Sequence, residues 1–468
     1  MRSTLFILLF SGSLLVHAQL RLPAILSSGM VLQQNDSVTL WGWANPFGGK
    51  VFVTTGWDGK TDSTFTSNYA TWKLKIKTPA AGGPYSIIVE TKNSRIELTD
   101  VLIGEVWVCS GQSNMEWNYY NGLQDIRDEL STCANPNIRF FQVPKSASEY
   151  PEDVGGSWRA CDSASLKSFS AVGYFFGKKL NQELNVPIGL INSSWGGTPA
   201  EVWTPAAVVQ QNTELKTAAN RLRPSSAWPS MPGVVYNAMI FPITQFNVAG
   251  VIWYQGESNT GTNDTYQLLF TKMIDAWRSA WKKEFPFYYV QLAPFAYGNK
   301  NIGALLQEAQ TKSLSHPKTG MVVITDLVDD VNDIHPVNKH DVGYRLANLA
   351  LVDTYSKPVA SFRSPQFKEA VSDKKKIELT FDYAPNGFMV KGKSAEGFFI
   401  SGDNDQWFPA VAKIDGSKII VSCREVSEPK YVRFGFANTI IGNVFSKEGL
   451  PLCPFRTDSF IVDQGPVK

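Results

Sequence analysis

The sequence predicts an α/β protein in which a central parallel sheet is covered on both faces by helices and is flanked by two β-rich domains. Three observations support this. From residue 102 to 355, apolar runs that end in polar, glycine-rich turns alternate with segments of helical period, which is typical of a parallel sheet. Residues 19–101 show short alternating apolar and polar stretches that predict a β-sandwich-like domain. Residues 356–468 return to that alternation and show no helical period, which predicts a second β-rich domain.

The individual elements follow from these patterns. The apolar runs of the central region are VPIGLINSSWGG, VAGVIWYQGESN, FPFYYVQLAPF and GMVVITDL. Helical periodicity occupies residues 172–184 and 266–285, and HDVGYRLANLALV at 340–352 also resembles a helix. Segments such as SVTLWGWA and TWKLKIKT predict the N-terminal strands, whereas KKIELTFDYAPNGFMVKG and KIIVSCREV predict C-terminal ones.

Residues 1–18 predict a secretory signal peptide. Arg2 precedes an apolar stretch from Leu5 to Val16, and the small residues Val16 and Ala18 fit cleavage after Ala18. The stretch is too short to span a bilayer, no cysteine follows it to carry a lipid, and no later segment reaches spanning length. We therefore expect a secreted or periplasmic protein that is not inserted in a membrane.

Composition excludes some partners and leaves others open. The chain of 468 residues has 44 basic and 42 acidic residues, a formal charge of +2, and 14 Trp and 28 Phe. This balance gives no electrostatic reason to expect nucleic acid or an anionic membrane as a partner. The oligomeric state is not predicted.

The five cysteines contain no CxxC pair, so we expect no zinc site, and no other metal or cofactor is predicted. Sequence proximity suggests that Cys133 pairs with Cys161 and Cys423 with Cys453, which leaves Cys109 alone. The alternative is that all five are unpaired thiols in the core.

Polar residues gather where the predicted strands end. Ser113 follows the apolar run VWVCS, and three later runs stop on similar turns at 193–198, 255–259 and 326–335. Ligands of an open α/β sheet bind at the carboxyl ends of its strands, because the loops converge there. A serine nucleophile needs a base. Of the four histidines, His335 is the best candidate, since Asp333 lies two residues before it, whereas His340 begins a predicted helix.

The context of Ser113 argues against the standard α/β-hydrolase arrangement. Residues 111–115 read GQSNM and lack the second glycine of the G-x-S-x-G elbow. The serine comes first in the chain, and the acid and the base lie close together near the end of the domain, which suits a different serine-hydrolase plan.

The motifs GQSNMEW, NSSWGGTPAEVW, GVIWYQGESN, NDIHPVNKHDVGYRLA and EGLPLCPFRTD, with the N-terminal SSGMVLQQ, resemble the sialate O-acetylesterase family of SGNH hydrolases. These are secreted carbohydrate esterases. The resemblance covers nearly the whole mature chain and implies an SGNH-hydrolase three-layer sandwich with a central parallel sheet as the catalytic domain.

The resemblance implies that Ser113 is the nucleophile and His335 its general base, with Asp333 orienting the imidazole. The sequence departs from the family in one respect, because many SGNH enzymes have Asp three residues before the histidine and this chain has Asn332. Three alternatives follow: Asp333 acts from a tighter turn, Asp330 acts, or the enzyme works largely as a Ser–His dyad.

The resemblance also implies an oxyanion hole and a sugar pocket. The hole would use the Ser113 backbone N–H, a backbone N–H of Gly196 or Gly197, and a side-chain amide, for which Gln255 is preferred over Asn259. Candidate substrate-binding residues are Gln112, Trp195, Glu257 and Asn259. Trp117, Trp203 and Tyr254 are candidates for lining the pocket, although a core position is the stronger expectation for each of them. Arg345 is a candidate partner for a sialate carboxylate and is equally expected as a solvated helix residue.

We therefore predict an O-acetylesterase that removes acetyl groups from sialic acid through an acetyl-serine intermediate. One alternative keeps the chemistry but changes the substrate to acetylated plant hemicellulose such as xylan or xyloglucan. A second is an inactive carbohydrate-binding protein, which the presence of both Ser113 and His335 disfavours.

Overall fold

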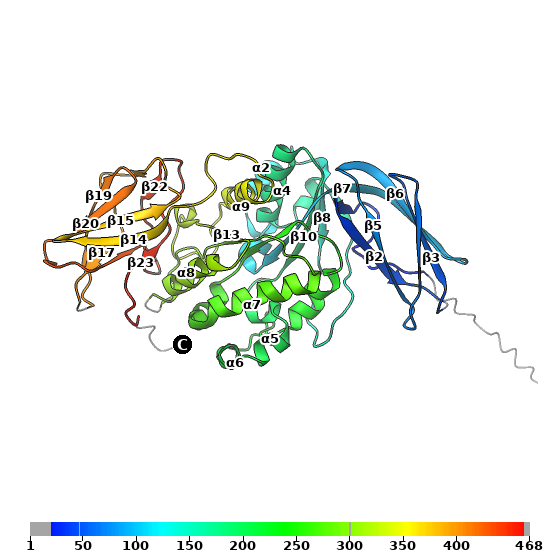
Figure 1. Ribbon diagram of the computed structural model, residues 1–468, viewed down its shortest axis with the longest axis horizontal. Coiled ribbons are helices and arrows are strands. Elements are labelled where there is room, and N and C mark those ends of the chain that lie inside the picture. Colours follow the sequence, from blue (N-terminus) through cyan, green and yellow to red (C-terminus); the bar gives the residue numbers. More distant parts are fainter. Residues whose placement is uncertain (1–19, 46, 299–300, 404, 463–468) are drawn as a thin grey trace, which may run out of the picture.

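The computed structural model describes residues 20–45, 47–298, 301–403 and 405–462. The predicted signal peptide and its cleavage site lie outside these residues. Three parts follow one another along the longest axis of the molecule: an N-terminal β-domain, a central α/β domain and a C-terminal β-domain (Figure 1). The predicted fold class is confirmed.

The central domain is built on one sheet. In the described residues its strands have the order β13-β12-β11-β7-β10-β8-β9. Pairing is parallel from β13 to β8, while β9 is antiparallel to β8. The sheet is therefore mixed rather than entirely parallel, because residues 143–157 contain no helix that could return the chain for a parallel pairing. The bounds are β8 (Asn135–Gln142), β9 (Trp158–Cys161), β10 (Ile188–Ser194), β11 (Gly250–Tyr254), β12 (Phe287–Val290) and β13 (Thr319–Val322).

The central strand β7 (Arg95–Gly111) connects two domains. Its first half pairs with β6 and β1 of the N-terminal domain, and its last seven residues pair with β10. The expected domain boundary between residues 101 and 102 falls inside this strand, which both domains share. Val106 and Val108 point into one core, whereas Trp107 and Cys109 point into the other. This strand is a continuous apolar run because both faces are covered.

The N-terminal domain packs two small sheets together. In one, β2 pairs with β5; in the other, β3 pairs with β4 and β6. Trp41, Trp72, Val51 and Ile87 contribute to a common core. The bounds are β1 (Val31–Gln33), β2 (Ser37–Trp43), β3 (Lys50–Thr55), β4 (Thr61–Phe65), β5 (Thr71–Lys77) and β6 (Gly82–Glu90).

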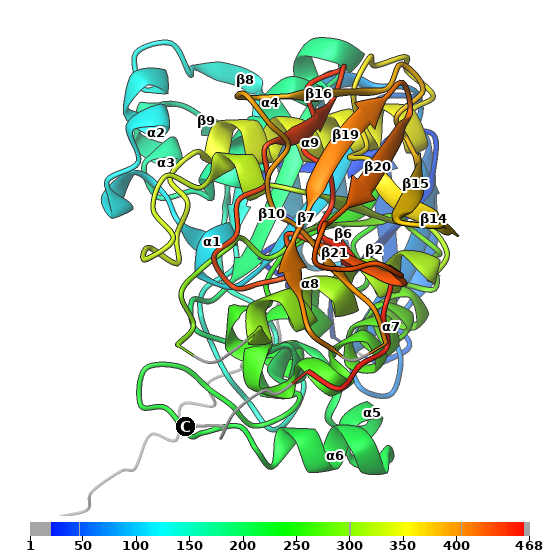
Figure 2. The same ribbon diagram turned by 90° about the vertical axis from the view of Figure 1, so that its left-hand side faces the viewer.

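Helices cover both faces of the central sheet (Figures 1 and 2). α4 (Ala171–Leu184) and α9 (Lys339–Asp353) lie on one face with the core around Trp107, while α7 (Asn263–Trp281) and α8 (Ile302–Lys312) lie on the other. α4 begins where the Ser170 side chain accepts the Gly173 N–H and ends at Asn185 in the left-handed conformation. All three helical segments predicted from the sequence are confirmed to within a few residues. The remaining helices are α1 (Ser113–Glu116), α2 (Gln124–Glu129), α3 (Ser163–Leu166), α5 (Ala206–Gln210) and α6 (Thr213–Ala219).

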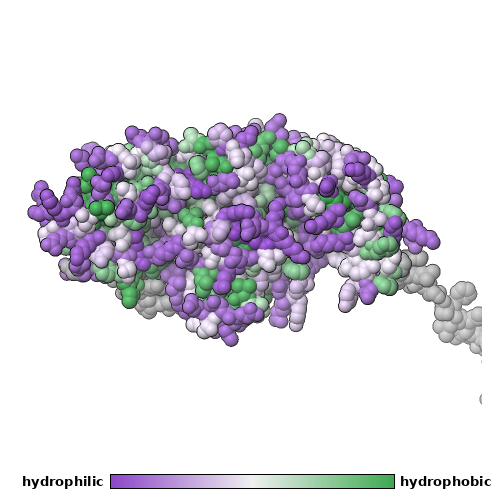
Figure 3. Space-filling model, viewed as in Figure 1, coloured by the Kyte–Doolittle hydropathy of each residue, from purple (hydrophilic) through white to green (hydrophobic). Residues whose placement is uncertain are grey.

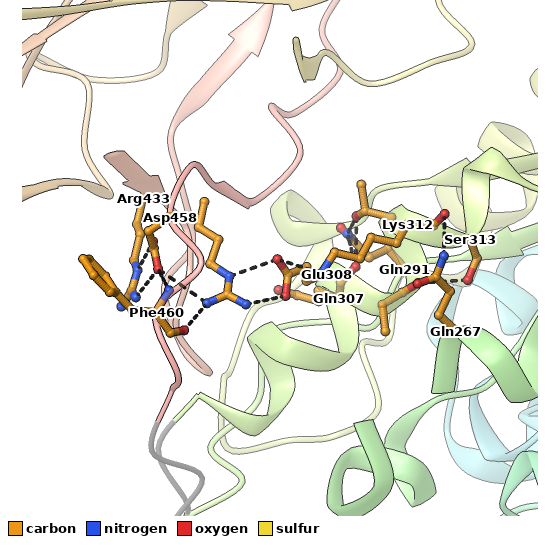
Figure 4. Close-up of polar contacts among 12 residues, drawn as sticks. Gln267, Gln291, Gln307, Glu308, Lys312, Ser313, Arg433, Asp458 and Phe460 are labelled. Atoms are coloured by element: carbon orange, nitrogen blue, oxygen red, sulfur yellow. Dashed lines mark hydrogen bonds and ion pairs between the residues drawn. The ribbon is translucent and has the colours of Figure 1, made fainter. Parts of the chain in front are cut away.

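The C-terminal domain has its own apolar core and is joined to α8 by an ion pair (Figure 4). Both guanidinium arms of Arg456 contact the Glu308 carboxylate at 2.9 and 3.0 Å, and Arg433 binds the buried Asp458 carboxylate. The Arg456–Glu308 pair fixes the last strand of this domain against the central domain, while the Arg433–Asp458 pair lies within the C-terminal domain. The bounds are β14 (Gln366–Asp373), β15 (Lys376–Asp382), β16 (Phe388–Val390), β17 (Phe398–Ser401), β18 (Phe408–Pro409), β19 (Val411–Asp415), β20 (Lys418–Ser422), β21 (Tyr431–Phe434), β22 (Val444–Ser446) and β23 (Phe455–Arg456).

The two disulfides suggested by sequence proximity are wrong, because all five cysteines are free thiols. The Cys161 thiol contacts the Cys133 backbone carbonyl at 3.1 Å rather than its sulfur. Cys453 is buried beside Gln291 and Thr311, whereas Cys423 contacts Glu425 at the surface of its domain. Burial raises the pKa of the Cys109 thiol, which keeps it protonated.

The surface is polar over most of the face in Figure 3, with hydrophobic residues in small groups. Within the described residues, no helix combines the length and the apolar character needed to cross a bilayer.

Candidate active site

The end of β7 places Ser113 at the carboxyl edge of the sheet. Gly111 has φ +135°, and an added Cβ there would lie 2.1 Å from the Tyr254 carbonyl oxygen on the neighbouring β11. Only glycine allows the two strand ends to come this close. The chain then turns into the short helix α1, whose first residue is Ser113. The apolar strand β7 gives way to polar residues because α1 begins at the carboxyl edge of the sheet and not inside the apolar core.

Ser113 meets His335 across 222 residues of sequence. The Ser113 Oγ lies 2.9 Å from His335 Nε2, which is within hydrogen-bonding distance. The Trp117 ring stacks on the imidazole with centroids 4.1 Å apart. Desolvation, followed by the positive charge of Lys339, lowers the pKa of His335, while Asp333 opposes the shift. The imidazole is therefore neutral near pH 7 and able to accept the serine proton.

Asp333 is the carboxylate next to the imidazole. Its Oδ1 accepts the His335 backbone N–H at 2.9 Å and lies 3.7 Å from His335 Nδ1. Asp330 instead accepts hydrogen bonds from the backbone and side chain of Asn332. The 3.7 Å separation is an ion-pair distance, longer than a hydrogen bond, and the Asp333 side chain is half exposed. The structure brings Ser113, His335 and Asp333 together and directs Asp330 into a local turn.

The Gly196–Gly197 loop adjoins Ser113. An added Cβ on Gly196 would lie 3.3 Å from Ser113 Cβ, so glycine leaves room for a substrate there. The Gly196 N–H donates to Glu116 Oε2 at 2.6 Å, and the other carboxylate oxygen pairs with Lys145. Gly197 has φ +80°, and an added Cβ would collide with the Trp228 ring.

Both side-chain amides considered for the oxyanion hole are bound into the scaffold. Gln255 Nε2 donates to Asn259 Oδ1 at 2.8 Å and to the Thr198 carbonyl at 3.3 Å. Asn259 Nδ2 donates to Glu201 and Thr262. Gln255 and Asn259 are fully buried, and in this structure their side-chain amides hold the surrounding loops together.

The candidate substrate-binding residues differ in whether they are buried in the scaffold or reach the surface. Gln112 is buried and accepts backbone N–H groups of Gly256 and Ser258 at 3.4 Å, which joins two loops. Glu257 is buried against Asn114. Trp195 is half-buried beside Gly196 and reaches the surface. Trp203 and Tyr254 are fully buried core residues, while Trp117 stacks on the His335 imidazole.

Residues 103–351 match the family described as carbohydrate esterase, sialic acid-specific acetylesterase. The chain belongs to this family. Human sialate O-acetylesterase is 30% identical over 95% of this chain and 94% of its own, and the mouse protein is 30% identical over 83% and 84%. The crystal structure of a carbohydrate acetylesterase from Xanthomonas citri shares 38% identity and a TM-score of 0.86, covering 94% of this chain and all of that one.

Membership in this esterase family makes the chain a carboxylic ester hydrolase and directs attention to its sugar-binding surface. Arg345 is not available there, because both arms bind Asp326 at 2.7 Å and one also donates to the Val323 carbonyl. The ion pair is nearly buried, so this candidate for binding a substrate carboxylate is corrected to a structural role.

A cavity of about 250 Å³ begins beside Gly197 and Ser258, and most of its other lining residues lie outside the sequence motifs. Arg221 lines it and pairs with Asp264 at 2.6 Å. Arg223 also lines it and forms no ion pair within the described part of the chain. The Trp228 ring is 38% exposed at its wall. Residues 220–232 follow helix α6 without helical or strand period, so only the tertiary structure shows that several of them lie beside the glycine loop.

Proposed function

We propose that this esterase hydrolyses O-acetyl esters of sialic acid through an acetyl-Ser113 intermediate. The 2.9 Å contact between Ser113 Oγ and His335 Nε2 at the carboxyl edge of the sheet carries the proposal. Family membership supports the ester chemistry, and the curated relatives from human and mouse are sialate O-acetylesterases.

In the proposed mechanism, His335 Nε2 takes the proton of Ser113 as its Oγ attacks the acetyl carbonyl carbon. The tetrahedral intermediate collapses, the bond to the sugar oxygen breaks, and His335 gives its proton to that oxygen. Water then attacks the acetyl-serine with His335 again acting as base, which releases acetate and restores the Ser113 hydroxyl. Asp333 stabilises the imidazolium formed in each step.

We assign the oxyanion hole to the Ser113 N–H and the Gly196–Gly197 loop. As the first residue of α1, Ser113 has no carbonyl within the helix to which its N–H can donate. The Gly196 N–H now donates to Glu116, so it serves an oxyanion only after that carboxylate turns away. Lys145, which already pairs with Glu116, can hold the Glu116 carboxylate after it leaves the Gly196 N–H.

The cavity beside Gly197 supports an anionic sugar as substrate. A sialate carboxylate fits an arginine fork, and Arg223 has no ion pair among the described residues. The exposed Trp228 ring offers an apolar face for the sugar.

A neutral acetylated hemicellulose is the second candidate substrate. The Xanthomonas citri relative, with higher identity than the mammalian ones, is described as a carbohydrate acetylesterase without reference to sialic acid. An inactive carbohydrate-binding protein is disfavoured, because the serine and the histidine are held in contact.

The test is acetate release from 9-O-acetylated sialic acid and from acetylated xylan and xyloglucan. We expect activity on the sialate, lowered on the order of 10⁴-fold or more by Ser113→Ala. Ser168→Ala, which removes a hydroxyl outside the site, is the matched control. Release from the plant polymers alone would transfer the proposal to the second substrate, and release unaffected by Ser113→Ala would refute the mechanism.

We also propose secretion. The signal sequence at residues 1–18 supports it. N-terminal sequencing of the mature protein should begin at Gln19, and an uncleaved cytoplasmic protein would refute the proposal.

A further inference from the structure

A lysine is buried directly beneath the candidate active site. Lys339 is the first residue of α9, four residues after His335, and its exposed fraction is 0%. A buried ammonium group loses its hydration, and a positive charge at the start of a helix faces the positive end of the helix dipole. Both effects oppose a lysine at this position, so its presence requires compensating contacts.

These contacts form a chain of three buried polar side chains. Lys339 Nζ donates to Asn114 Oδ1 at 2.5 Å. Asn114 Nδ2 donates to Glu257 Oε1 at 2.5 Å and to the Ile334 carbonyl at 3.0 Å. The cation also lies 5.6 Å from the centroid of Trp117, the ring that stacks on the catalytic imidazole.

The chain joins the segments that carry both catalytic groups. Asn114 directly follows Ser113, Ile334 directly precedes His335, and Glu257 lies on the loop after β11. One buried amide therefore holds the nucleophile's helix against the histidine's loop. The second oxygen of Glu257 has no hydrogen-bond partner in the described residues, so the carboxylate acts mainly as the counter-charge.

The charges around Lys339 come from several elements. Burial lowers the pKa of Lys339 to about 7, while Glu257, Asp125 and Asp333 raise it. Burial raises the pKa of Glu257. The Tyr254 ring lies 5.4 Å from the cation, its pKa is raised by burial, and its phenol therefore stays neutral.

The helix that carries Lys339 adds two further charged groups. His340 follows it, and its Nδ1 contacts the Asp341 carboxylate, which lowers the pKa of Asp341 to about 2. Asp125 of α2 accepts the backbone N–H groups of both Lys339 and His340. Below pH 7, where His335 titrates, Lys339 carries its positive charge and disfavours the imidazolium.

We propose that Lys339 is a positioning residue, which acts through Asn114 to hold Ser113 against His335 and whose charge keeps His335 in the neutral, proton-accepting form. This inference rests on the proposed Ser113–His335 mechanism. It does not depend on which sugar is the substrate, because Lys339, Asn114 and Glu257 do not line the cavity that Arg223 lines.

The test measures kcat and KM for 4-nitrophenyl acetate from pH 4.5 to 9 in the full-length mature protein. In Lys339→Met, kcat should fall by about 10- to 100-fold, since a misplacement of about 1 Å has an effect of that size. The acid limb of kcat/KM should move to higher pH by several tenths of a unit to about one unit, because a positive charge near His335 is lost. Lys339→Arg keeps the charge and should retain the wild-type acid limb, even if kcat falls.

Lys178→Met is the control, because it removes the charge of a partly buried lysine that is paired with Glu129. Its acid limb should equal that of the wild type. If Lys339→Met does not fold, Lys339→Gln replaces it, since an amide can still donate to Asn114. An acid limb that stays in place, or moves to lower pH, would overturn the proposal. Folding lost in every uncharged variant but kept in Lys339→Arg would also overturn it, by showing a purely structural role.

The two proposals fail in different ways. If Ser113→Ala keeps full activity, the proposed mechanism fails whatever Lys339 does. If Ser113→Ala and His335→Ala are inactive and Lys339→Met has the wild-type kcat and acid limb, only the role of Lys339 is refuted.

Discussion

Replacing Gly111 by alanine should damage both stability and catalysis, because two backbones meet at this point. Alanine at φ +135° is strained by about 1–3 kcal/mol. Its Cβ would lie 2.1 Å from the Tyr254 carbonyl oxygen and 2.7 Å from its carbon, so β7 or β11 must shift, which costs about 1–3 kcal/mol more. We expect Gly111→Ala to lower the free energy of unfolding by about 2–6 kcal/mol.

The same shift should reach the nucleophile, which lies two residues further along the chain. A displacement of Ser113 by about 1 Å should lower kcat/KM for 4-nitrophenyl acetate about 10²-fold. The assay pairs these kinetics with urea unfolding followed by circular dichroism. Gly59→Ala is the control, since Gly59 has φ +69° and no atom within 4 Å of the added Cβ, so it is strained but does not collide. A Gly111→Ala protein as stable and as active as Gly59→Ala would refute the reasoning.

The remaining predictions concern protons, substrate charge and domain attachment. Because the pKa of His335 is lowered, kcat/KM should rise with pH through a midpoint below 6.5 and be lost at more acid pH, as a pH–rate profile would show. Asp333→Asn should lower kcat about 10- to 100-fold, less than for a fully buried triad acid, because water screens this half-exposed carboxylate. Arg223→Gln should lower kcat/KM about 10- to 100-fold for acetylated sialate and leave 4-nitrophenyl acetate unaffected. A double-mutant cycle of Arg456→Met and Glu308→Gln should give a coupling of about 1–3 kcal/mol in unfolding.

Two of these predictions have a control variant within the chain, and each has a result that would contradict it. A midpoint at or above 6.5 would contradict the lowered pKa of the histidine. Asp330→Asn should leave kcat nearly unchanged, and a larger effect than that of Asp333→Asn would move the acid's role to Asp330. Arg221→Gln, which removes the arginine already paired with Asp264, should affect sialate less than Arg223→Gln. Equal effects of Arg223→Gln on the charged and neutral esters would exclude carboxylate binding. A coupling near zero would show that the domains attach by other contacts.

The sequence by itself determined the architecture and predicted the pair of side chains, Ser113 and His335, that the structure brings into contact. The spacing of apolar residues along a helix or strand reflects which face of it is buried. Because those residues are near one another in the chain, the spacing can be recognised in the sequence alone. The segment 172–184 therefore predicted α4 closely. Ser113 and His335 were predicted because polar residues at the ends of parallel strands must converge.

Only the tertiary structure decided where the neighbouring side chains point. Gln255 follows the end of a predicted strand, as Ser113 does, but its side chain donates to the buried Asn259. The Arg345 guanidinium forms an ion pair with Asp326. Lys339 occupies a helix start that sequence patterns treat as solvent-exposed, yet it is buried against Asn114, which lies 225 residues away. The direction of a loop side chain depends on contacts with distant segments, and spacing along one chain carries no information about them.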